Sequence, residues 1–386
     1  MIILEKPYVS EFLTETLKKQ NYPVLKNKSI SDLKINETLN FWDENFAVEQ
    51  LKAQKNALIY SNSENSINWI TNNLGFTDLP KKINLFKDKV KFRELLTKIY
   101  PNFYFKEVEL EELQNIDDSE LIFPFVIKPS VGFLSMGVYL VKDSESWKTI
   151  LKSIKSDIEK TKGIFPSEVL NSSKFIIEEY IEGEEYAIDA YYNGQGKPVI
   201  LNILKHPFSS ETDVSDRVYY TSSEIIRENL SKFKELLVKI GELSDLKNFP
   251  IHIELRKDKE KIVPIEVNPM RFAGWCITDL AYYAYGINIY EYYFNQLEPD
   301  WKKILENDDN SIYYTTIADI PTDLDKKNII KIDYEKLLTN IKEPMDIRKI
   351  DFRKHPLFAI ILSKTQDYRE ISNILKIDFK QYIELA

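Results

Sequence analysis

Apolar and polar residues alternate along two consecutive runs within residues 251–269, and a short charged stretch separates the two runs. Alternation with a period of two is typical of a half-buried β-strand, so the pattern predicts an antiparallel hairpin. If the turn is centred on Glu260, Glu254 lies directly opposite Glu266. Successive side chains of a strand point to opposite faces, so Asn268 shares the face of Glu266. The pattern therefore brings two carboxylates and one amide to the same face.

The remaining pattern divides the chain into four parts. Residues 1–85 alternate short apolar strands with helical repeats, which is typical of a small α/β domain. Residues 86–182 hold several predicted strands around a turn of small residues. Residues 183–300 contain further strands and the hairpin, and residues 301–386 form an extension that either completes the sheet or makes a dimer contact. Few apolar repeats occur over 205–224, which we expect to be a long functional loop.

The charge balance and the cysteine content narrow the class of protein. The 386 residues include 52 Lys and Arg against 61 Asp and Glu, a formal net charge of −9. This balance disfavours general nucleic-acid binding, which needs a basic surface. The single cysteine, Cys276, excludes an internal disulfide framework and is typical of a reducing compartment. No apolar run reaches the length of a membrane span and the N-terminus does not read as a signal peptide, so we expect a cytoplasmic protein without membrane contact.

Several common catalytic and nucleotide-binding motifs are absent from the sequence. The three histidines, His206, His252 and His355, do not cluster, which argues against a zinc site. No serine lies in a nucleophile-elbow motif, and neither a Gly-x-Gly-x-x-Gly fingerprint after a strand nor a Walker A motif occurs. Nucleotide binding therefore needs another scaffold.

The hairpin carboxylates have a chemical implication of their own. Glu254 and Glu266 repel each other across the two strands, and a bound cation removes that cost. Two carboxylates and the amide oxygen of Asn268 are hard ligands that suit Mg²⁺, with phosphate oxygens completing its shell. The alternative is an exposed hairpin whose charges are solvated.

Four segments, taken in their order along the chain, form a recognisable set. They are Asp88-Lys89, the strand 123–130 with its small-residue loop to Gly137, the segment 175–186, and the hairpin with Glu254, Glu266 and Asn268. Together they resemble the ATP-grasp superfamily over about residues 85–300. The resemblance implies an ATP-grasp fold, of mixed α+β and α/β class. It would comprise an N-terminal α/β domain, a β-rich lid subdomain within 86–182, and an antiparallel-sheet catalytic subdomain within 183–300 that is extended by 301–386.

The resemblance also implies how ATP is bound. Lys89 and Lys128 would contact the phosphates as point charges, with a solvated helix charge as the alternative for Lys89. The small-residue turn after Lys128 would approach the phosphates with backbone N–H groups, although Phe133 and Leu134 replace glycines of some relatives. The segment 178–181 would hydrogen-bond adenine, and a glutamate after it would hold the ribose hydroxyls. The implied ATP-contacting residues are Lys89, Lys128, Ser130, Gly132, Glu178, Glu179, Ile181 and, for the ribose, Glu185.

The remaining chemistry is assigned by the resemblance to the hairpin and to an arginine after it. Glu254, Glu266 and Asn268 would ligate Mg²⁺, with Mn²⁺ as an alternative. Arg271 and Lys128 would be the catalytic residues. Arg271 would act on the transferring phosphoryl group or on the substrate carboxylate, since a guanidinium fits either of them.

Substrate selection is expected in the 205–224 loop and after Arg271. Arg217 is the second substrate candidate beside Arg271, and pairing with its acidic neighbours is the alternative for it. Other positively charged candidates are Lys205, His206 and Arg227, and Trp275 and Cys276 either line the acceptor pocket or are buried beneath the sheet.

The resemblance implies an enzyme of the ligase class. The superfamily's usual reaction uses ATP to phosphorylate a carboxylate, and a nucleophile then attacks the acylphosphate and releases phosphate. We therefore expect an ADP-forming ligase that joins a small acid, such as an amino acid, to an amine or another nucleophile. A carboxylase that uses bicarbonate is one alternative, although no biotin-carrier Met-Lys-Met occurs. A catalytically degenerate ATP-binding protein is the other, and a homodimer is left open.

Overall fold

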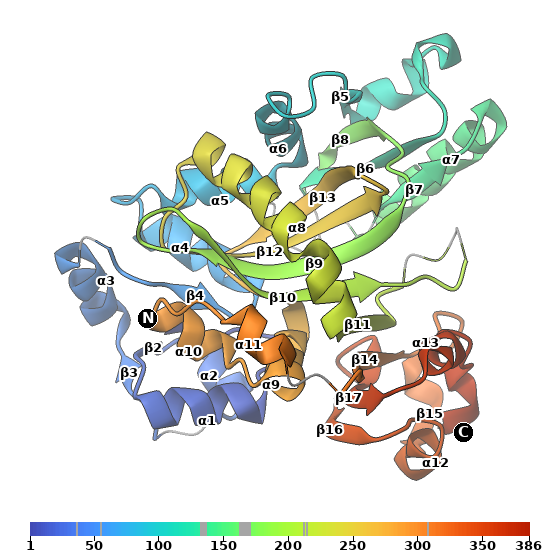
Figure 1. Cartoon of the computed structure of the whole chain (residues 1–386). Coiled ribbons are helices and arrows are strands. Elements are labelled where there is room, and N and C mark those ends of the chain that lie inside the picture. The colour runs from blue at the N-terminus through green and yellow to red at the C-terminus, as the bar shows by residue number, and fades with distance from the viewer. Residues whose placement is uncertain are drawn as a thin grey trace.

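The computed structural model describes residues 1–386 apart from 36–37, 55, 132–136, 162–170, 211–212, 214 and 307–308. Within this part of the chain the strands form four sheets, and the largest sheet lies between the N-terminal part and a smaller antiparallel sheet (Figure 1). None of the helices built by these described residues has both the length and the apolar character that crossing a membrane requires.

The N-terminal part is a parallel sheet with helices around it. Its strands, in the order β3-β2-β1-β4, are β1 (Ile2–Ile3), β2 (Val24–Leu25), β3 (Phe41–Trp42) and β4 (Tyr60–Ser61). The helices are α1 (Glu11–Gln20), α2 (Lys28–Asp32), α3 (Glu44–Ala53) and α4 (Ile67–Asn73). Both residues of β1 are fully buried, as expected of a central parallel strand that is covered on both faces. The predicted N-terminal α/β fold is confirmed.

A four-stranded antiparallel sheet, which we call the lid sheet, follows helices α5 (Leu79–Lys87) and α6 (Lys89–Leu96). In the order β5-β8-β6-β7 its strands are β5 (Phe105–Glu109), β8 (Asn171–Glu179), β6 (Phe125–Val131) and β7 (Tyr139–Val141). Helix α7 (Ser144–Thr161) places Trp147 edge-on against Phe125, with ring centroids 5.5 Å apart. The lid sheet therefore has a small hydrophobic core of its own.

The third sheet, which we call the large sheet, has eight antiparallel strands in the order β13-β12-β9-β10-β11-β14-β17-β16. They are β9 (Glu184–Tyr192), β10 (Pro198–His206), β11 (Val218–Ser222), β12 (Phe249–Asp258), β13 (Lys261–Pro269), β14 (Ile312–Asp319), β16 (Pro344–Lys349) and β17 (Leu357–Thr365). Three of these strands follow residue 301, so the C-terminal segment completes the sheet, which was one of the two alternatives for it.

The remaining elements are a short two-stranded sheet, made of β15 and β18, and several helices. They are α8 (Ser223–Ser244), α9 (Leu280–Tyr285), α10 (Ile289–Phe294), α11 (Trp301–Glu306), α12 (Tyr334–Leu338), α13 (Tyr368–Leu375), β15 (Ile329–Ile332) and β18 (Ile383–Leu385). Helix α8 packs against the sheet so closely that a side chain at Gly241 would meet the ring of Tyr192 at 2.3 Å.

The β12–β13 hairpin has the predicted opposition of its carboxylates, but its turn is shorter than expected. The turn holds two residues, because Asp258 already pairs with Lys261. Continued without interruption, that register would place Ile265 opposite Glu254. A β-bulge next to Glu254 shifts the register by one residue and pairs Glu254 with Glu266. The bulge thus keeps both acids on one face, since a one-residue slip moves a side chain to the other face.

The prediction of one long loop over 205–224 is wrong at both ends. β10 runs to His206, β11 occupies Val218–Ser222, and α8 follows directly. Every residue of β11 is buried, because the strand lies inside the large sheet between β10 and β14. A strand covered on both faces lacks the apolar–polar alternation that marks a half-buried strand. Residues 211–212 and 214 of the remaining loop lie outside the described residues.

Candidate functional site

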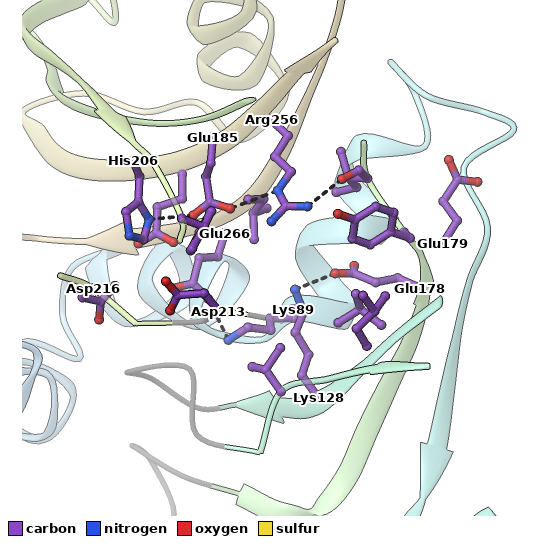
Figure 2. Close-up of a pocket in the computed structure, with 18 of the residues that line it drawn as sticks. Lys89, Lys128, Glu178, Glu179, Glu185, His206, Asp213, Asp216, Arg256 and Glu266 are labelled. Carbon is purple, nitrogen blue, oxygen red and sulfur yellow. Dashed lines mark hydrogen bonds and ion pairs between the residues drawn. The ribbon is translucent and has the colours of Figure 1, made fainter. Parts of the chain in front are cut away.

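A pocket lies between the lid sheet and the large sheet, where β8 leads into β9 (Figure 2). Its empty volume, which includes the part that is open to solvent, is about 1080 Å³. Eight residues that the resemblance assigned to ATP or metal line this pocket: Lys89, Lys128, Glu178, Glu179, Ile181, Glu185, Glu254 and Glu266. The fold thus brings α6, both sheets and their connection to one place.

At the lid side of the pocket, Glu178 is held by two cations. Lys128 Nζ lies 2.5 Å from Glu178 Oε1, and Arg93 Nε lies 2.6 Å from Glu178 Oε2. All three side chains are almost fully buried. Burial alone would raise the pKa of Glu178, but Arg93 and Lys128 outweigh burial and lower this pKa to about 2. Arg93 is a residue that the sequence did not single out.

Lys89 is positioned by the start of helix α6. The Asp88 side chain caps this helix by accepting hydrogen bonds from the backbone N–H groups of Val90 and Lys91. Lys89 Nζ lies 3.1 Å from Glu266 Oε2. Burial lowers the pKa of Lys89, yet the attraction of Glu266 outweighs burial and raises it. Because Lys89 is only 7% exposed, the alternative of a solvated helix charge is wrong.

The pKa values of the two hairpin acids are shifted in opposite directions. Burial, followed by the charge of Glu266, raises the pKa of Glu254 well above its ordinary value. Burial also acts on Glu266, but Lys89 and Lys128 outweigh it and lower the pKa of Glu266 to about 2. Asn268 donates through Nδ2 to Glu266 Oε1 at 3.3 Å, and it is itself buried rather than part of the pocket wall.

This donor set fits a magnesium ion. Two carboxylates and an amide are hard oxygen ligands, and a divalent cation would remove the repulsion that raises the pKa of Glu254. No group of three His, Cys, Asp or Glu side chains gathers at one point anywhere in the described part of the chain. Such an ion would therefore depend on Asn268 and on phosphate oxygens as well as on the two acids.

At the opposite end of the pocket, Glu185 lies between His206 and Arg256 (Figure 2). His206 Nδ1 is 3.0 Å from Glu185 Oε1, and Arg256 Nε is 3.0 Å from Glu185 Oε2. His206 was one of the positive candidates, whereas Arg256 was missed. Its signal was present, because Arg256 stands two residues after Glu254 on the same strand and so shares its face.

Arg271 is not among the residues that line the pocket. Its Nη2 lies 3.3 Å from Glu64 Oε1, and its Nη1 donates to the backbone oxygen of Phe272 at 2.8 Å. Lys87 Nζ lies 2.5 Å from the other oxygen of Glu64. Glu64 follows β4, so a residue of the N-terminal part holds the predicted catalytic arginine. Neither Glu64 nor Lys87 was predicted.

The segment 270–279, which carries Arg271, is anchored to β9 by a buried carboxylate. Asp189 accepts hydrogen bonds from Ala273 N at 2.8 Å and from Thr278 Oγ1 at 2.7 Å. The same side chain contacts His252 Nδ1 at 2.8 Å. Asp189 is fully buried, so these bonds compensate for the lost hydration of its carboxyl oxygens.

A second anchor of this segment comes from the C-terminal part. Trp275 and Cys276 both have a left-handed φ of 55°, which is uncommon for residues other than glycine. Arg348 on β16 donates to the backbone oxygen of Cys276 at 2.7 Å and pairs with Asp279 at 2.8 Å. Cys276 is buried, and burial raises its pKa to about 11. Of the two alternatives for Cys276, the structure therefore supports burial.

Arg217 points toward the C-terminal segment instead of the pocket. Its Nη1 donates to the backbone oxygens of Leu375 at 3.1 Å and Ile377 at 2.9 Å, and its Nη2 lies 3.3 Å from Asp319. The guanidinium therefore connects the residue before β11 to the end of α13, to the residue Ile377 beyond it, and to β14. Among the other positive candidates, Lys205 pairs with Glu184, Arg227 binds the backbone oxygen of Leu305, and His206 lines the pocket.

Among the described residues, the predicted ATP contact Ser130 is not brought to the pocket wall. Ser130 is buried on β6 and does not line the pocket. Gly132 lies outside the described residues, and so do Phe133 and Leu134 of the same turn.

Comparisons with known proteins agree with this fold. Residues 121–279 match the family model of the ATP-grasp domain. The crystal structure of L-amino acid ligase from Bacillus licheniformis is similar with a TM-score of 0.73 at 17% sequence identity, covering 100% of this chain and 98% of that one. Residues 121–279 therefore carry the sequence pattern of an ATP-grasp domain, and the whole chain shares the fold of that solved structure.

Two further solved structures resemble the chain over its whole length. Biotin carboxylase from Campylobacter jejuni has a TM-score of 0.63 at 13% identity, covering 100% of this chain and 92% of that one. N5-carboxyaminoimidazole ribonucleotide synthetase from Thermotoga maritima has a TM-score of 0.62 at 15% identity, with 100% and 98% covered. No curated protein matches the sequence. The expected ATP-grasp fold, with its lid and its antiparallel catalytic sheet, is confirmed.

Proposed function

We propose that this protein is an ATP-dependent ligase of the ATP-grasp superfamily. It would activate a small carboxylate, such as an amino acid, as an acylphosphate for attack by an amine or another nucleophile, with ADP and phosphate as products. The observation that carries the proposal is the opposition of Glu254 and Glu266 in a pocket that also holds Lys89 and Lys128. A magnesium–triphosphate needs acids for the metal and ammonium groups for the phosphates in this arrangement.

Lys89 and Lys128 supply the positive charge for the phosphates. Each of them is paired inside the pocket, Lys89 with Glu266 and Lys128 with Glu178. An ammonium group is a compact charge on a flexible stem, so it can turn from a carboxylate to a phosphate oxygen without leaving the site. The paired lysines are therefore suited to exchange partners when a triphosphate binds.

Glu254, Glu266 and the amide oxygen of Asn268 would hold Mg²⁺, or Mn²⁺ in its place. When bound, the ion neutralises charge on the transferring phosphoryl group and on the leaving ADP. The two acids are suited to this role because they already lie on one face of the hairpin, held there by the bulge of β13.

The pocket also has groups that suit a nucleoside. Val126, Leu140 and Ile265 line it and offer an apolar contact to a base. The backbone of residues 179–181 offers hydrogen-bonding groups to the base edge, and Glu185 offers a carboxylate to the vicinal hydroxyls of a ribose.

Arg271 is our candidate for the group that contacts the acid substrate or the transferring phosphoryl. Its guanidinium can bind either group with two hydrogen bonds. Its pairing with Glu64 and the two anchors of its segment limit its freedom. No nucleophilic side chain is required, because positioning and charge screening supply the catalysis in such a reaction.

The experiment that tests the function is ADP release by the full chain, with ATP, Mg²⁺ and a panel of amino acids, other small acids and bicarbonate. Hydroxylamine is added as a small amine, because it converts an acylphosphate to a hydroxamate. We expect ADP to depend on one class of acid and the hydroxamate to form in proportion to it. ADP with bicarbonate alone would indicate the carboxylase. No ADP with any acid, despite nucleotide binding, would indicate a degenerate binding protein.

The matched control uses two glutamates of the same hairpin. Glu266→Gln removes a proposed metal ligand, whereas Glu260→Gln changes an exposed turn residue that pairs with Lys232. We expect turnover to be lost in the first variant and kept in the second.

A further inference from the structure

The carboxylate of Glu185 is held at both of its oxygens by neighbouring strands. β9 lies between β10 and β12, and Glu185 is directly opposite His206 in one ladder and Arg256 in the other. The three side chains thus form a row across one face of the large sheet. His206 approaches Oε1 at 3.0 Å and Arg256 approaches Oε2 at 3.0 Å. Burial would raise the pKa of Glu185, but these two neighbours lower it.

His206 is itself fixed in place. It is 4% exposed, and its ring is stacked on Tyr219 with centroids 4.1 Å apart. Its second nitrogen, Nε2, lies 3.1 Å from the backbone oxygen of Ser215. Both ring nitrogens are thus in contact with neighbouring oxygens. Together with the stacking on Tyr219, these contacts fix the position of His206 beside Glu185.

Arg256 connects Glu185 to the link between the two sheets. Its Nη1 donates to the backbone oxygen of Ile181 at 2.9 Å, and its guanidinium lies 5.2 Å from the ring centre of Tyr180. In this link the chain passes close to β12. Gly183 has a φ of 108°, and a side chain there would meet the backbone of Lys257 at 2.3 Å. Arg256 thus sets the position of the predicted adenine-binding backbone and of Glu185 together.

We propose that Arg256 and His206 are positioning residues that present Glu185 to the 2′- and 3′-hydroxyls of a bound ribonucleotide. This inference rests on the proposed function, since it requires a nucleotide in the pocket. Each carboxylate oxygen has two lone pairs, so an oxygen that contacts His206 or Arg256 can still accept from a hydroxyl. With both oxygens held, the carboxylate keeps one orientation and can serve both hydroxyls at once. The pocket then distinguishes a ribonucleotide from a 2′-deoxyribonucleotide through Glu185, whose orientation His206 and Arg256 fix.

The test compares ADP with 2′-deoxyADP by isothermal titration calorimetry on the full chain at saturating Mg²⁺. A hydrogen bond to a charged group leads us to expect that the wild-type protein binds ADP roughly tenfold more tightly or better. Arg256→Gln and His206→Asn should weaken ADP binding and bring the ratio of the two affinities toward one. Arg256→Lys keeps the charge without the planar fork, so its ratio should fall between those of the wild type and Arg256→Gln.

The ratio separates positioning from a purely structural role, because general damage to the pocket weakens both nucleotides alike. Arg369→Gln is the control, since Arg369 is exposed on α13 and should keep the wild-type ratio. If Arg256→Gln does not fold, Arg256→Lys and His206→Asn still decide the question. An unchanged ratio in the Arg256 and His206 variants would overturn the inference alone. A wild-type protein that binds neither nucleotide would overturn the proposed function together with it.

Discussion

The ion pairs inside the pocket differ, in what they connect, from the ion pairs that hold the segment of Arg271. In the pocket, Lys89 pairs with Glu266 and Lys128 pairs with Glu178. Both partners of each pair are proposed to contact ATP or its metal ion. A ligand that carries phosphates and a cation brings replacement partners for Lys89, Lys128 and Glu266. Glu178 keeps Arg93, so both pairs can be exchanged when the ligand binds.

Outside the pocket, the ion pairs connect the parts of the fold that hold the segment of Arg271. Arg348 and Asp279 join β16 to the segment that carries Arg271, and Lys87 joins Glu64 to the end of α5. None of these four residues lines the pocket. The comparison teaches that burial and opposite charge do not by themselves mark a binding site. What distinguishes the pocket is that its ion pairs share a cavity with further ligand-type side chains. Substitutions in the two regions should therefore affect different quantities.

The largest effect is expected from Arg348→Met. It leaves Asp279 buried without its cationic partner, which should lower the free energy of unfolding by about 3–5 kcal/mol. Because Arg348 lies outside the pocket, the affinity for ADP with Mg²⁺ should stay within about twofold. Urea unfolding and calorimetry of the same preparation check both quantities. A variant that keeps its stability but binds ADP more weakly would contradict the assignment of Arg348 to the framework.

Glu266→Gln should show the opposite pattern. The variant loses one proposed metal ligand, so its magnesium-dependent affinity for ADP should fall roughly a hundredfold, on the order of 3 kcal/mol. The measurement is a titration of ADP at several Mg²⁺ concentrations, with Glu260→Gln as the control. A variant that keeps the full magnesium dependence would remove Glu266 from the metal site.

The pH dependence of stability tests the lid side of the pocket. The pKa of Glu178 is lowered from 4.5 to about 2 in the folded state, so the unfolded chain binds this proton at higher pH than the folded one. The stabilisation is present above pH 4.5 and is lost as the pH falls toward 2. Between pH 5.5 and 3, the difference in unfolding free energy between the wild type and Glu178→Gln should shrink by an amount on the order of 1–2 kcal/mol. A constant difference would mean that Arg93 and Lys128 do not hold this charge.

The smallest effect is expected from Arg217→Ala. The change removes hydrogen bonds to the C-terminal segment, which should lower the free energy of unfolding by about 1–2 kcal/mol. The KM values for ATP and for the acid substrate should not change. A raised KM for the acid at unchanged stability would restore the substrate role that the sequence suggested for Arg217.

Most features of the hairpin could be predicted from the sequence. Its alternation identified both strands, and the opposition of Glu254 and Glu266 was predicted correctly even though the turn was placed one residue too long. The bulge that corrects the register leaves no signal in an alternating pattern. The pocket residues were predicted because they belong to short segments in a fixed order, and each segment contributes its side chain through local geometry.

The failures have a common cause in long-range packing. β11 was missed because both of its faces are covered, which removes the alternation from its sequence. Arg217 was assigned by its charge alone, and its actual partners lie about 160 residues further along the chain. Glu64 and Arg348 contact the Arg271 segment only after three distant parts of the chain have assembled. The domain boundaries, the homodimer and the cellular location stay predictions.

The measurement that tests the central claim most directly is a thermal shift of the full chain with ATP alone, with Mg²⁺ alone and with both. A ligand that binds only the folded state at a hundred times its Kd stabilises that state by about 2.7 kcal/mol. We predict a clear rise in Tm that needs ATP and Mg²⁺ together, because the pocket provides separate groups for the phosphates and for the metal. An unchanged Tm at millimolar concentrations of both would contradict the account.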